Sequence, residues 1–408
     1  MRFIADLHIH SHFSIATSKQ LTPEMLDLWS KKKGITVTGT GDAVHPGWRK
    51  ELKEKLRYAG NGLYTLKKAY RLPESNAWNT RHFFMLTAEI SCIYKFDGRV
   101  RKVHNIIAAS DFKSMDKIAR RLERVGNIAS DGRPILGLDS RDLLEIVLES
   151  GDNNFLIPAH IWTPWFSVLG SRSGFDSVEQ CFRDLSSHIF ALETGLSSDP
   201  PMNRGCSFLD RYALISSSDA HSPEKLGREA TLFNTDISFG AMVAALKNRA
   251  GGELLGTIEF FPEEGKYHLD GHRKCGIRWQ PQDTLEHNGL CPVCGKAVTV
   301  GVLSRVTELA DRRLWGNCKN DNFYYLTSLK GLLSEITGTS AGSKKTAALY
   351  ESCLSRFGSE FDILLTTPLT AIKGIDSRIA EGIRRLRAGT VTRVGGFDGE
   401  FGSIKLFT

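Results

Sequence analysis

The residues that could carry out chemistry begin near the start of the chain, in Asp6-Leu7-His8-Ile9-His10-Ser11-His12. In an extended strand, side chains two positions apart point to the same face, so His8, His10 and His12 would project together. Neutral imidazole is a common metal ligand. A lone His-x-His pair is a weak signal, because most histidines have structural roles, so further ligands must be found downstream.

Further imidazoles and carboxylates recur at, or just beyond, the ends of predicted strands in the first 221 residues. They are Asp42, His45, Glu89, His104, His160, Glu193, Asp219 and His221. In a parallel β/α barrel, the carboxyl ends of the strands form one rim, and active sites are built there. These side chains should therefore meet at one opening. Imidazole and carboxylate together suit Zn, Mn or Fe, and there are enough ligands for more than one ion.

Short apolar runs that alternate with helical segments must position these residues. Predicted strands cover residues 3–7, 35–38, 83–87, 103–108, 155–158, 190–192 and 213–216, and predicted helices lie near 114–125, 140–148, 177–185 and 238–249. Another helix begins at Thr22-Pro23-Glu24, where a cap residue precedes proline at the first helical position. This alternation predicts a parallel α/β fold, either a barrel or an open sheet. Residues 45–81 look like an insertion on a loop.

The length of 408 residues predicts two or three domains. Glycine and proline near 251–252 and 262–265 mark the end of the first. We expect a catalytic domain at 1–262, a cysteine-bearing module at 263–301 and a basic helical C-terminal domain at 302–408. Its helices are predicted at 302–313, 323–336, 344–356 and 377–387, before a glycine-rich stretch at 394–399.

The cysteine-bearing module has the spacing of a structural zinc site. His272-x2-Cys275 and Cys291-x2-Cys294 form two ligand pairs separated by 15 residues. His268 is an alternative fourth ligand in place of His272. Redox activity is the competing interpretation of Cys-x-x-Cys, but the companion His–Cys pair disfavours it.

Positive charge is concentrated at the C-terminal end. Residues 1–264 hold 33 Lys and Arg against 32 Asp and Glu, whereas residues 265–408 hold 20 against 14. Such asymmetry suits a polyanionic partner such as DNA or RNA, although an ordinary solvated surface explains charge alone equally well. The sequence contains no apolar run long enough to span a bilayer and does not begin with a secretory signal, so we expect a cytoplasmic protein without a membrane partner.

Basic residues near predicted helix ends are candidate contacts to the DNA backbone. Lys344 and Lys345 begin a helix after a glycine-rich segment that fails as an ATP-binding loop, because its glycine spacing is one residue short. A helix amino terminus with two lysines could still hold a phosphate. Arg384 and Arg385 lie on the last predicted helix, after a segment at 372–376 that hints at a helix-hairpin-helix contact. A solvated face is an equally good interpretation.

The order of these motifs resembles the polymerase-and-histidinol-phosphatase (PHP) superfamily. The opening segment is followed by Glu89, His104, His160 and Asp219-Ala220-His221, as in that superfamily. More narrowly, residues 39–46, 158–165, 193–200 and 216–222 resemble the endonuclease Q family, and the likeness extends over almost the whole chain. One departure is Gly41-Asp42-Ala43, where many PHP proteins have Thr-Asp-His, so Asp42 or His45 would replace the missing imidazole.

The resemblance implies a distorted (β/α)7 PHP barrel, with a small zinc-binding module and a helical C-terminal domain. It implies an endonuclease that cuts single- or double-stranded DNA on the 5′ side of uracil, hypoxanthine, xanthine or an abasic site. Its cofactors would be divalent metal ions (Zn, Mg or Mn) and a structural Zn, and a replication or repair factor could recruit it. The implied metal ligands are His8, His10, Asp42, His45, Glu89, His104, His160, Asp219 and His221.

Asp219, His221 and Glu193 are candidate catalytic groups, and Glu193 could instead bind a metal ion or orient a neighbouring histidine. Because enzymes that read a damaged base usually extrude it, Trp162, Trp165 and Phe166 are candidates for a base pocket. Packing of the barrel rim explains these aromatic residues equally well. Asn203 and the serines at 216–218 could supply hydrogen bonds to a base or phosphate.

Two other functions remain open at this point. A PHP phosphatase that acts on a small phosphate ester would explain the barrel, but neither the zinc module nor the basic C-terminal third. A non-catalytic DNA-binding adaptor would explain the charge, but not the nearly complete set of ligands.

Overall fold

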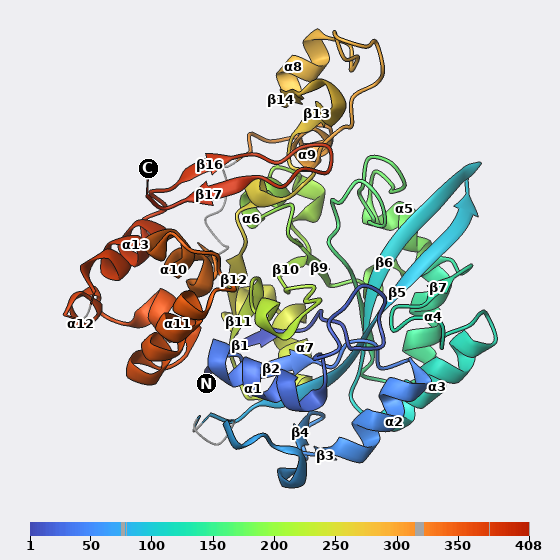
Figure 1. Ribbon diagram of the computed structural model, residues 1–408. Helices are drawn as coiled ribbons and strands as arrows, with labels where there is room; N and C mark the ends of the chain where they lie inside the picture. The colour runs from blue at the N-terminus through green and yellow to red at the C-terminus, as the bar shows by residue number, and fades with distance from the viewer. Residues whose placement is uncertain (75–77, 79, 315–321, 375, 408) are drawn as a thin grey trace.

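The strands that carry the candidate ligands curve into a barrel (Figure 1) in the computed structural model of the protein, which describes residues 1–74, 78, 80–314, 322–374 and 376–407. The strands β1 (Arg2–Asp6), β2 (Val37–Gly39) and β5 (Phe83–Phe96) are neighbours and run parallel. The strands β9 (Ala191–Glu193) and β10 (Ala213–Ile215) are also parallel, and β9 lies beside β8 (Phe155–Pro158). The predicted α/β barrel is therefore confirmed.

Two antiparallel strands distort this barrel. The strand β6 (Arg99–Ala109) runs antiparallel between β5 and β8, and β11 (Ala230–Asn234) runs antiparallel to β1. The strands β5 and β6 are longer than the sequence predicts and form a two-stranded ribbon that extends beyond the barrel (Figure 1). A short strand, β7 (Ile135–Leu136), pairs with β5.

Helices cover the outside of the barrel, and their capping residues explain where they begin. They are α1 (Pro23–Lys33), α2 (Pro46–Lys55), α3 (Phe112–Glu123), α4 (Ser140–Glu149), α5 (Val178–Phe182), α6 (Pro200–Arg204) and α7 (Phe239–Lys247). The hydroxyl of Thr22 accepts a hydrogen bond from the amide of Met25, which confirms the predicted start of α1. Asp111 and Asp139 cap α3 and α4 in the same way.

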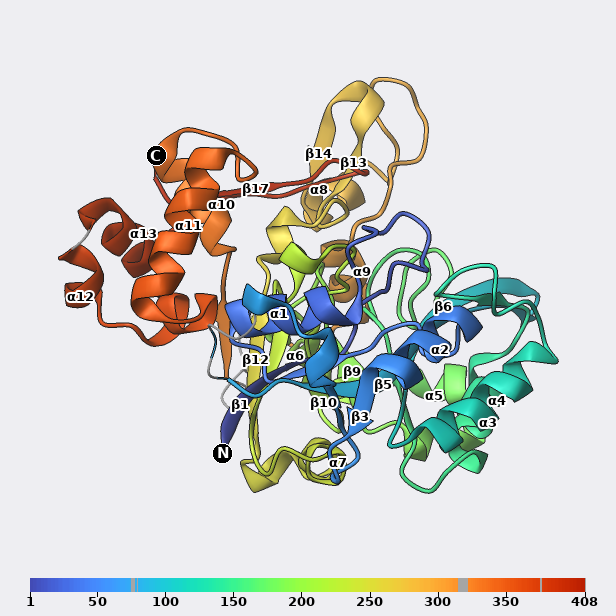
Figure 2. The same cartoon turned by 60° about the horizontal axis from the view of Figure 1, so that its bottom comes forward.

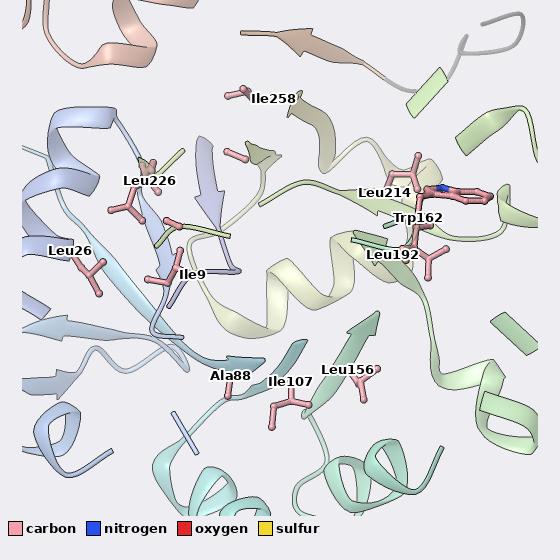
Figure 3. Packing of buried hydrophobic residues seen from close by; sticks show 14 of the residues in the cluster. Ile9, Leu26, Ala88, Ile107, Leu156, Trp162, Leu192, Leu214, Leu226 and Ile258 are labelled. Carbon is pink, nitrogen blue, oxygen red and sulfur yellow. The ribbon is translucent and has the colours of Figure 1, made fainter. Parts of the chain in front are cut away.

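Apolar side chains fill the interior of the barrel. One cluster takes residues from nearly every barrel strand and from α7, including Phe3, Ile157 and Phe239. A second cluster lies between the strands and the surrounding helices and includes Ile107 and Leu156 (Figure 3). Because α7 packs on the amino-terminal ends of strands, as Phe239 does against Phe155 at the start of β8, we expect the chemistry at the opposite rim.

Two predictions outside the barrel core are wrong. Residues 45–81 are not simply a loop, because α2 is followed by the strands β3 (Leu56–Tyr58) and β4 (Tyr64–Leu66), which extend the sheet beside β5. The helix predicted at 323–336 begins with a strand, β15 (Phe323–Tyr325), which pairs with β12 (Leu254–Glu259). Phe-Tyr-Tyr favours strand, and α10 (Leu329–Thr337) starts only after the cap Ser328.

The cysteine-bearing module projects from the barrel beside its open rim (Figures 1 and 2). It contains β13 (Asp270–His272), β14 (Ile277–Trp279) and α8 (Pro281–Glu286). The helices α10, α11 (Lys344–Phe357), α12 (Leu369–Lys373) and α13 (Ser377–Arg387) form a separate group beside α1. The hairpin of β16 (Thr392–Val394) and β17 (Ser403–Lys405) leads back from this group to the module.

The segment that follows residue 302 makes contacts with the barrel. The helix α9 (Val302–Leu309) packs on α6, and the guanidinium of Arg305 donates hydrogen bonds to the carbonyl oxygens of Leu169 and Phe175. Since β15 also belongs to the barrel sheet, we propose that the helical domain starts near α10. None of the helices in the described ranges is both long and apolar enough to cross a bilayer.

Candidate active site

Four side chains from three parts of the sequence meet at the open rim of the barrel. The ligand atoms of His8, His10, Glu89 and Asp219 all lie within 4.8 Å of one another. The strand β1 ends at Asp6, but the chain stays extended, because the amide of His10 donates to the carbonyl of Ala220 (3.1 Å) and the amide of Asp219 donates to that of His8 (2.8 Å). The two imidazoles therefore project together as predicted.

A second group shares Glu89 with the first. Nδ1 of His104 lies 2.6 Å from Oε1 of Glu89, and Nε2 of His160 lies 3.3 Å from the same oxygen. The other oxygen, Oε2, lies 3.4 Å from Nε2 of His8 and 3.3 Å from Nε2 of His10. The carboxylate of Glu89 thus presents one oxygen to each group.

The hairpin of β5 and β6 explains why His104 reaches this place although its strand runs against the barrel direction. Glu89 pairs with Ile106, so Glu89 and His104 are diagonal neighbours on one face of the two strands. The expectation that ligands lie at the carboxyl ends of strands does not hold for His104, which lies within β6.

The histidines of the first group are oriented by carboxylates behind them. Nδ1 of His8 donates to Oε2 of Glu193 (2.9 Å), and Nδ1 of His10 donates to Oδ1 of Asp42 (3.1 Å). Each imidazole therefore turns Nε2 towards Glu89 and Asp219. This carboxylate–histidine arrangement is typical of metal-binding histidines.

The donor set fits divalent cations. Nε2 of His8 is buried and has no hydrogen-bond partner among the residues that the structure describes, although a buried polar atom without one is costly. Burial disfavours the protonated form of His8, but the charges of Glu193 and Glu89 outweigh this effect and hold its pKa well above its ordinary value. Crowded carboxylates of this kind need positive charge among them, and imidazole with carboxylate is a suitable ligand set for zinc or manganese.

Backbone strain gathers at the same rim. Asp42, His160 and Asp219 have φ values of 52°, 28° and 47°, in the region that side chains rarely adopt. Such conformations persist only where surrounding contacts impose them, and they are frequent at functional sites.

Several predicted ligands have other roles. Asp42 accepts hydrogen bonds from His10 and from Ser11 and Ser14, and it lies outside both ligand groups. His45 is not placed to bind a metal, because its Nδ1 accepts from the amide of Trp48 and its Nε2 donates to the carbonyl of Ala129. These contacts correct the prediction that either residue replaces the missing imidazole.

Three further candidates are outside both ligand groups. Glu193 orients His8 and also accepts the amide of His160 (2.8 Å). Nδ1 of His221 donates to the carbonyl oxygen of Asp219 (2.8 Å), and its ring lies 4.7 Å from that of His10. His12 turns away, because its Nδ1 donates to the carbonyl of Leu21.

A cleft of about 520 Å³ opens in front of the ligand groups. His104, His160 and Asp219 line one side of it. Its aromatic residues are Trp165, Phe166, Phe260, Tyr267 and Phe401, and its basic residues are Arg133, Arg228 and Lys266. Nη1 of Arg133 lies 3.3 Å from Oε2 of Glu89. The sequence patterns missed Tyr267, Phe401 and the three basic residues, because nothing in their spacing connects them to the histidines.

One of the three residues predicted for the base pocket, Trp162, is not among the residues that line the cleft. Trp162 is only 1% exposed and lies in the hydrophobic core (Figure 3). Its indole N–H donates to Oδ1 of Asn203. It therefore offers no free face to a base, and Asn203 is buried with it. Trp165 is 38% exposed and Phe166 packs on His104, and both line the cleft. Of the serines at 216–218, only Ser217 lines the cleft among the described residues.

The predicted zinc ligands lie together in the module. The ligand atoms of His272, Cys275, Cys291 and Cys294 are within 4.8 Å of one another. Gly295 has a φ of 69°, and its amide donates to the carbonyl of Cys291, which forms the tight turn of the second cysteine pair. His268 lies outside this group, which corrects its place as an alternative ligand.

The candidate DNA-backbone residues differ in their availability. Lys344 and Lys345 are exposed at the start of α11, behind the cap Ser343. Arg384 and Arg385 both form ion pairs with Glu381, and Arg385 also donates to the carbonyl of Leu406. Arg385 is therefore a poor candidate for DNA contact. In the predicted helix-hairpin-helix segment, α12 ends at Lys373 and α13 begins at Ser377, and Ile375 lies outside the described residues.

Two family models match parts of the chain. The model described as "PHP-associated" matches residues 207–250, and the model described as "MJ0043 C-terminal domain" matches residues 328–390. The uncharacterized protein MJ0043 of Methanocaldococcus jannaschii is 30% identical over 289 residues, or 69% of this chain. The chain spans only 35% of that relative's length. The uncharacterized protein YqxK of Bacillus subtilis is 30% identical over 324 residues, or 76% of this chain and 78% of that protein.

Two solved structures share the fold over nearly the whole chain. The lesion-specific endonuclease PfuEndoQ from Pyrococcus furiosus is 30% identical, with a TM-score of 0.86 over 99% of this chain and 95% of that one. Endonuclease Q in complex with a 27-mer duplex substrate, with an abasic lesion at the active site, is also 30% identical. Its TM-score is 0.85, over 99% of this chain and 96% of the other.

Proposed function

Because the chain belongs to the endonuclease Q family of the PHP superfamily, we propose that it is a metal-dependent DNA repair endonuclease. Its proposed reaction is hydrolysis of the phosphodiester bond on the 5′ side of a deaminated base (uracil, hypoxanthine or xanthine) or of an abasic site. The observation that carries this proposal is the pair of ligand groups that share Glu89 at the wall of an aromatic cleft.

Two cation positions are proposed from the two ligand groups. His8, His10, Glu89 and Asp219 would hold one ion, and Glu89, His104 and His160 would hold a second. When bound, such ions would activate water and neutralise charge on the scissile phosphate. Zn, Mg and Mn all accept imidazole or carboxylate ligands, so the donor set supports divalent metal without selecting one.

The side chains around these positions have distinct proposed roles. Glu193 and Asp42 keep Nε2 of His8 and His10 directed at the ligand groups, through the hydrogen bonds at Nδ1. The guanidinium of Arg133 lies beside Glu89 and lines the cleft, where it could pair with a phosphate oxygen. His221 keeps Nε2 as an acceptor, since its Nδ1–H is held by the carbonyl of Asp219, and it could supply or take a proton.

The cleft and the C-terminal half would bind the DNA. Trp165 and Phe166 are the remaining candidates for stacking on an extruded base. Lys344 and Lys345 are exposed at the start of α11, where they could contact phosphates. The ligands His272, Cys275, Cys291 and Cys294 would hold a zinc ion that stabilises the module.

A cleavage assay tests this function and separates it from the alternatives. Labelled duplexes with a uracil, a hypoxanthine, an abasic site or no lesion are incubated with protein and Mn²⁺ or Mg²⁺, beside a His8→Ala control. A nick on the 5′ side of the lesion supports the proposal. Hydrolysis of a small phosphate ester alone would identify a phosphatase, and binding without cleavage an adaptor.

A further inference from the structure

A large apolar side chain stands in solvent at the edge of the cleft. Phe401 is 77% exposed, although burial of a phenylalanine side chain normally contributes ~1.5–3 kcal/mol. It lines the same cleft as His160, Asp219 and Arg133. Because an exposed ring contributes little to the stability of the fold, its presence at this cleft suggests that it contacts a ligand.

The backbone that carries Phe401 is held firmly. The connection between β16 and β17 turns at Asp398 and Gly399, whose φ values of 43° and 89° are those of a tight hairpin turn. Phe397 and Glu400 close it with two backbone hydrogen bonds of 3.0 and 2.8 Å. The carboxylate of Asp398 accepts the amide of Arg273 and the hydroxyl of Thr299, which ties the turn to the cysteine-bearing module.

A second set of contacts fixes the hairpin to the segment behind the cleft. The amide of Gly396 donates to the carbonyl of Glu263 (2.7 Å), and the amide of Gly402 donates to that of Glu264 (3.1 Å). A Cβ atom at Gly402 would lie 2.0 Å from the carbonyl oxygen of Glu263, so only glycine allows this approach next to Phe401. The exposed ring is thus presented from a rigid support, and little ordering entropy remains to be lost on binding.

The surroundings of Phe401 indicate what it contacts. Its neighbours in the cleft include the basic residue Lys266 and the aromatic pair Trp165 and Tyr267, whose ring centroids lie 5.6 Å apart. An aromatic ring among cations suits nucleic acid, because bases stack on aromatic side chains while phosphates pair with lysine and arginine.

We propose that Phe401 is a positioning residue that enters the DNA duplex and occupies the space left when the damaged nucleotide turns out towards the ligand groups. This inference rests on the proposed endonuclease function and adds to it a distinction between duplex and single-stranded substrates. In a duplex, the extruded nucleotide leaves two neighbouring bases without a stacking partner, and the Phe401 ring restores one stack. In a single strand there is no such gap to fill.

The test compares kcat/KM of wild type and Phe401→Ala on three substrates: a duplex with a uracil, a duplex with an abasic site and a single strand with an abasic site. Loss of the stack between a base and an aromatic ring should lower kcat/KM by about 5- to 150-fold. We expect a loss in this range on both duplexes, little change on the single strand, and recovery of most of the duplex activity in Phe401→Trp.

The control is Tyr58→Ala. Tyr58 is an aromatic residue with 57% exposure on β3, outside the residues that line the cleft, and its replacement should leave all three rates unchanged. Because Phe401 is exposed, its variant should also keep the wild-type melting temperature, which separates a local effect from loss of folding.

Each outcome bears on the inference. Equal loss on duplex and single strand would overturn it, as would wild-type rates on the abasic duplex. Loss on the uracil duplex alone would also overturn it, because Phe401 would then stack on the damaged base itself. If the wild-type protein nicks none of the three substrates, the proposed function fails and the inference falls with it.

Discussion

Replacement of Glu193 by glutamine tests whether a carboxylate behind His8 sets the affinity for metal. Glu193 accepts the Nδ1–H of His8 (2.9 Å) and the amide of His160 (2.8 Å) through the same oxygen. A glutamine side chain has one oxygen and one NH₂ group. Its oxygen can still accept these two hydrogen bonds, but it carries no negative charge. The NH₂ group of the glutamine would then face His8 as a second donor, because Nδ1 of His8 lies 3.2 Å from the other carboxylate oxygen of Glu193, Oε1.

The expected effect is a weaker metal site rather than a broken one. Loss of a carboxylate that orients a ligating histidine typically lowers metal affinity by about 10- to 100-fold. This corresponds to ~1.4–2.7 kcal/mol, in the range of one charge-assisted hydrogen bond. The Mn²⁺ concentration for half-maximal nicking of an abasic duplex should rise by this factor, while the rate at saturating Mn²⁺ recovers most of its wild-type value.

Two measurements check this prediction. The first is nicking rate against Mn²⁺ concentration, and the second is calorimetric titration of Mn²⁺ into the protein without DNA. Glu149→Gln is the matched control, because Glu149 is exposed and pairs only with Arg121 among the described contacts. An unchanged half-saturation in Glu193→Gln would refute the role of this carboxylate in metal binding.

Four other predictions follow from the described contacts. Asp219→Ala should abolish nicking and leave affinity for a lesion-containing duplex largely intact, as measured by fluorescence anisotropy; normal nicking would contradict the ligand set. Cys294→Ser should lower the zinc content and the melting temperature of the protein, as measured by metal analysis and differential scanning fluorimetry, whereas an unchanged zinc content would exclude Cys294 as a ligand. Burial raises the pKa of Glu259 to about 8, so the folded protein holds a proton that the unfolded chain releases above its ordinary pKa of 4.5. Wild-type melting temperature should therefore fall as pH rises from about 4.5 to 8, and Glu259→Gln should fall less over this window. Replacing both Lys344 and Lys345 with alanine should reduce the slope of log affinity against log salt by up to about 1.8, since each phosphate contact contributes ~0.9; an unchanged slope would place them outside the interface.

The barrel and much of its rim could be predicted, because local patterns carry that information. Apolar strands alternate with capped helices, and Thr22-Pro23 gives the start of α1 correctly. His8 and His10 share a face for the simple reason that extended chain repeats every two residues. Such local patterns could not predict that β6 runs antiparallel to β5, since strand pairing depends on contacts between distant segments.

The errors at the site have the same origin. His45 is close in sequence to the position of a missing ligand, but its hydrogen bonds to Trp48 and Ala129 use both ring nitrogens. Trp162 follows His160 closely, yet its side chain points into the core. Phe401 reaches the cleft because the β16–β17 hairpin contacts residues 263–273, and no periodicity in the sequence predicts that contact.

The pairing of β15 with β12 limits how the enzyme can be shortened. Among the described strands, β15 lies at the edge of the barrel sheet, and β12 is its inner neighbour. A truncation after residue 301 would remove β15 and leave one edge of β12 unpaired, which invites edge-to-edge aggregation. It would also remove Arg305, which secures the segment around Leu169 and Phe175. We therefore expect a stable fragment that contains the barrel to extend at least through Leu326, whose amide donates to the carbonyl of Glu259 on β12.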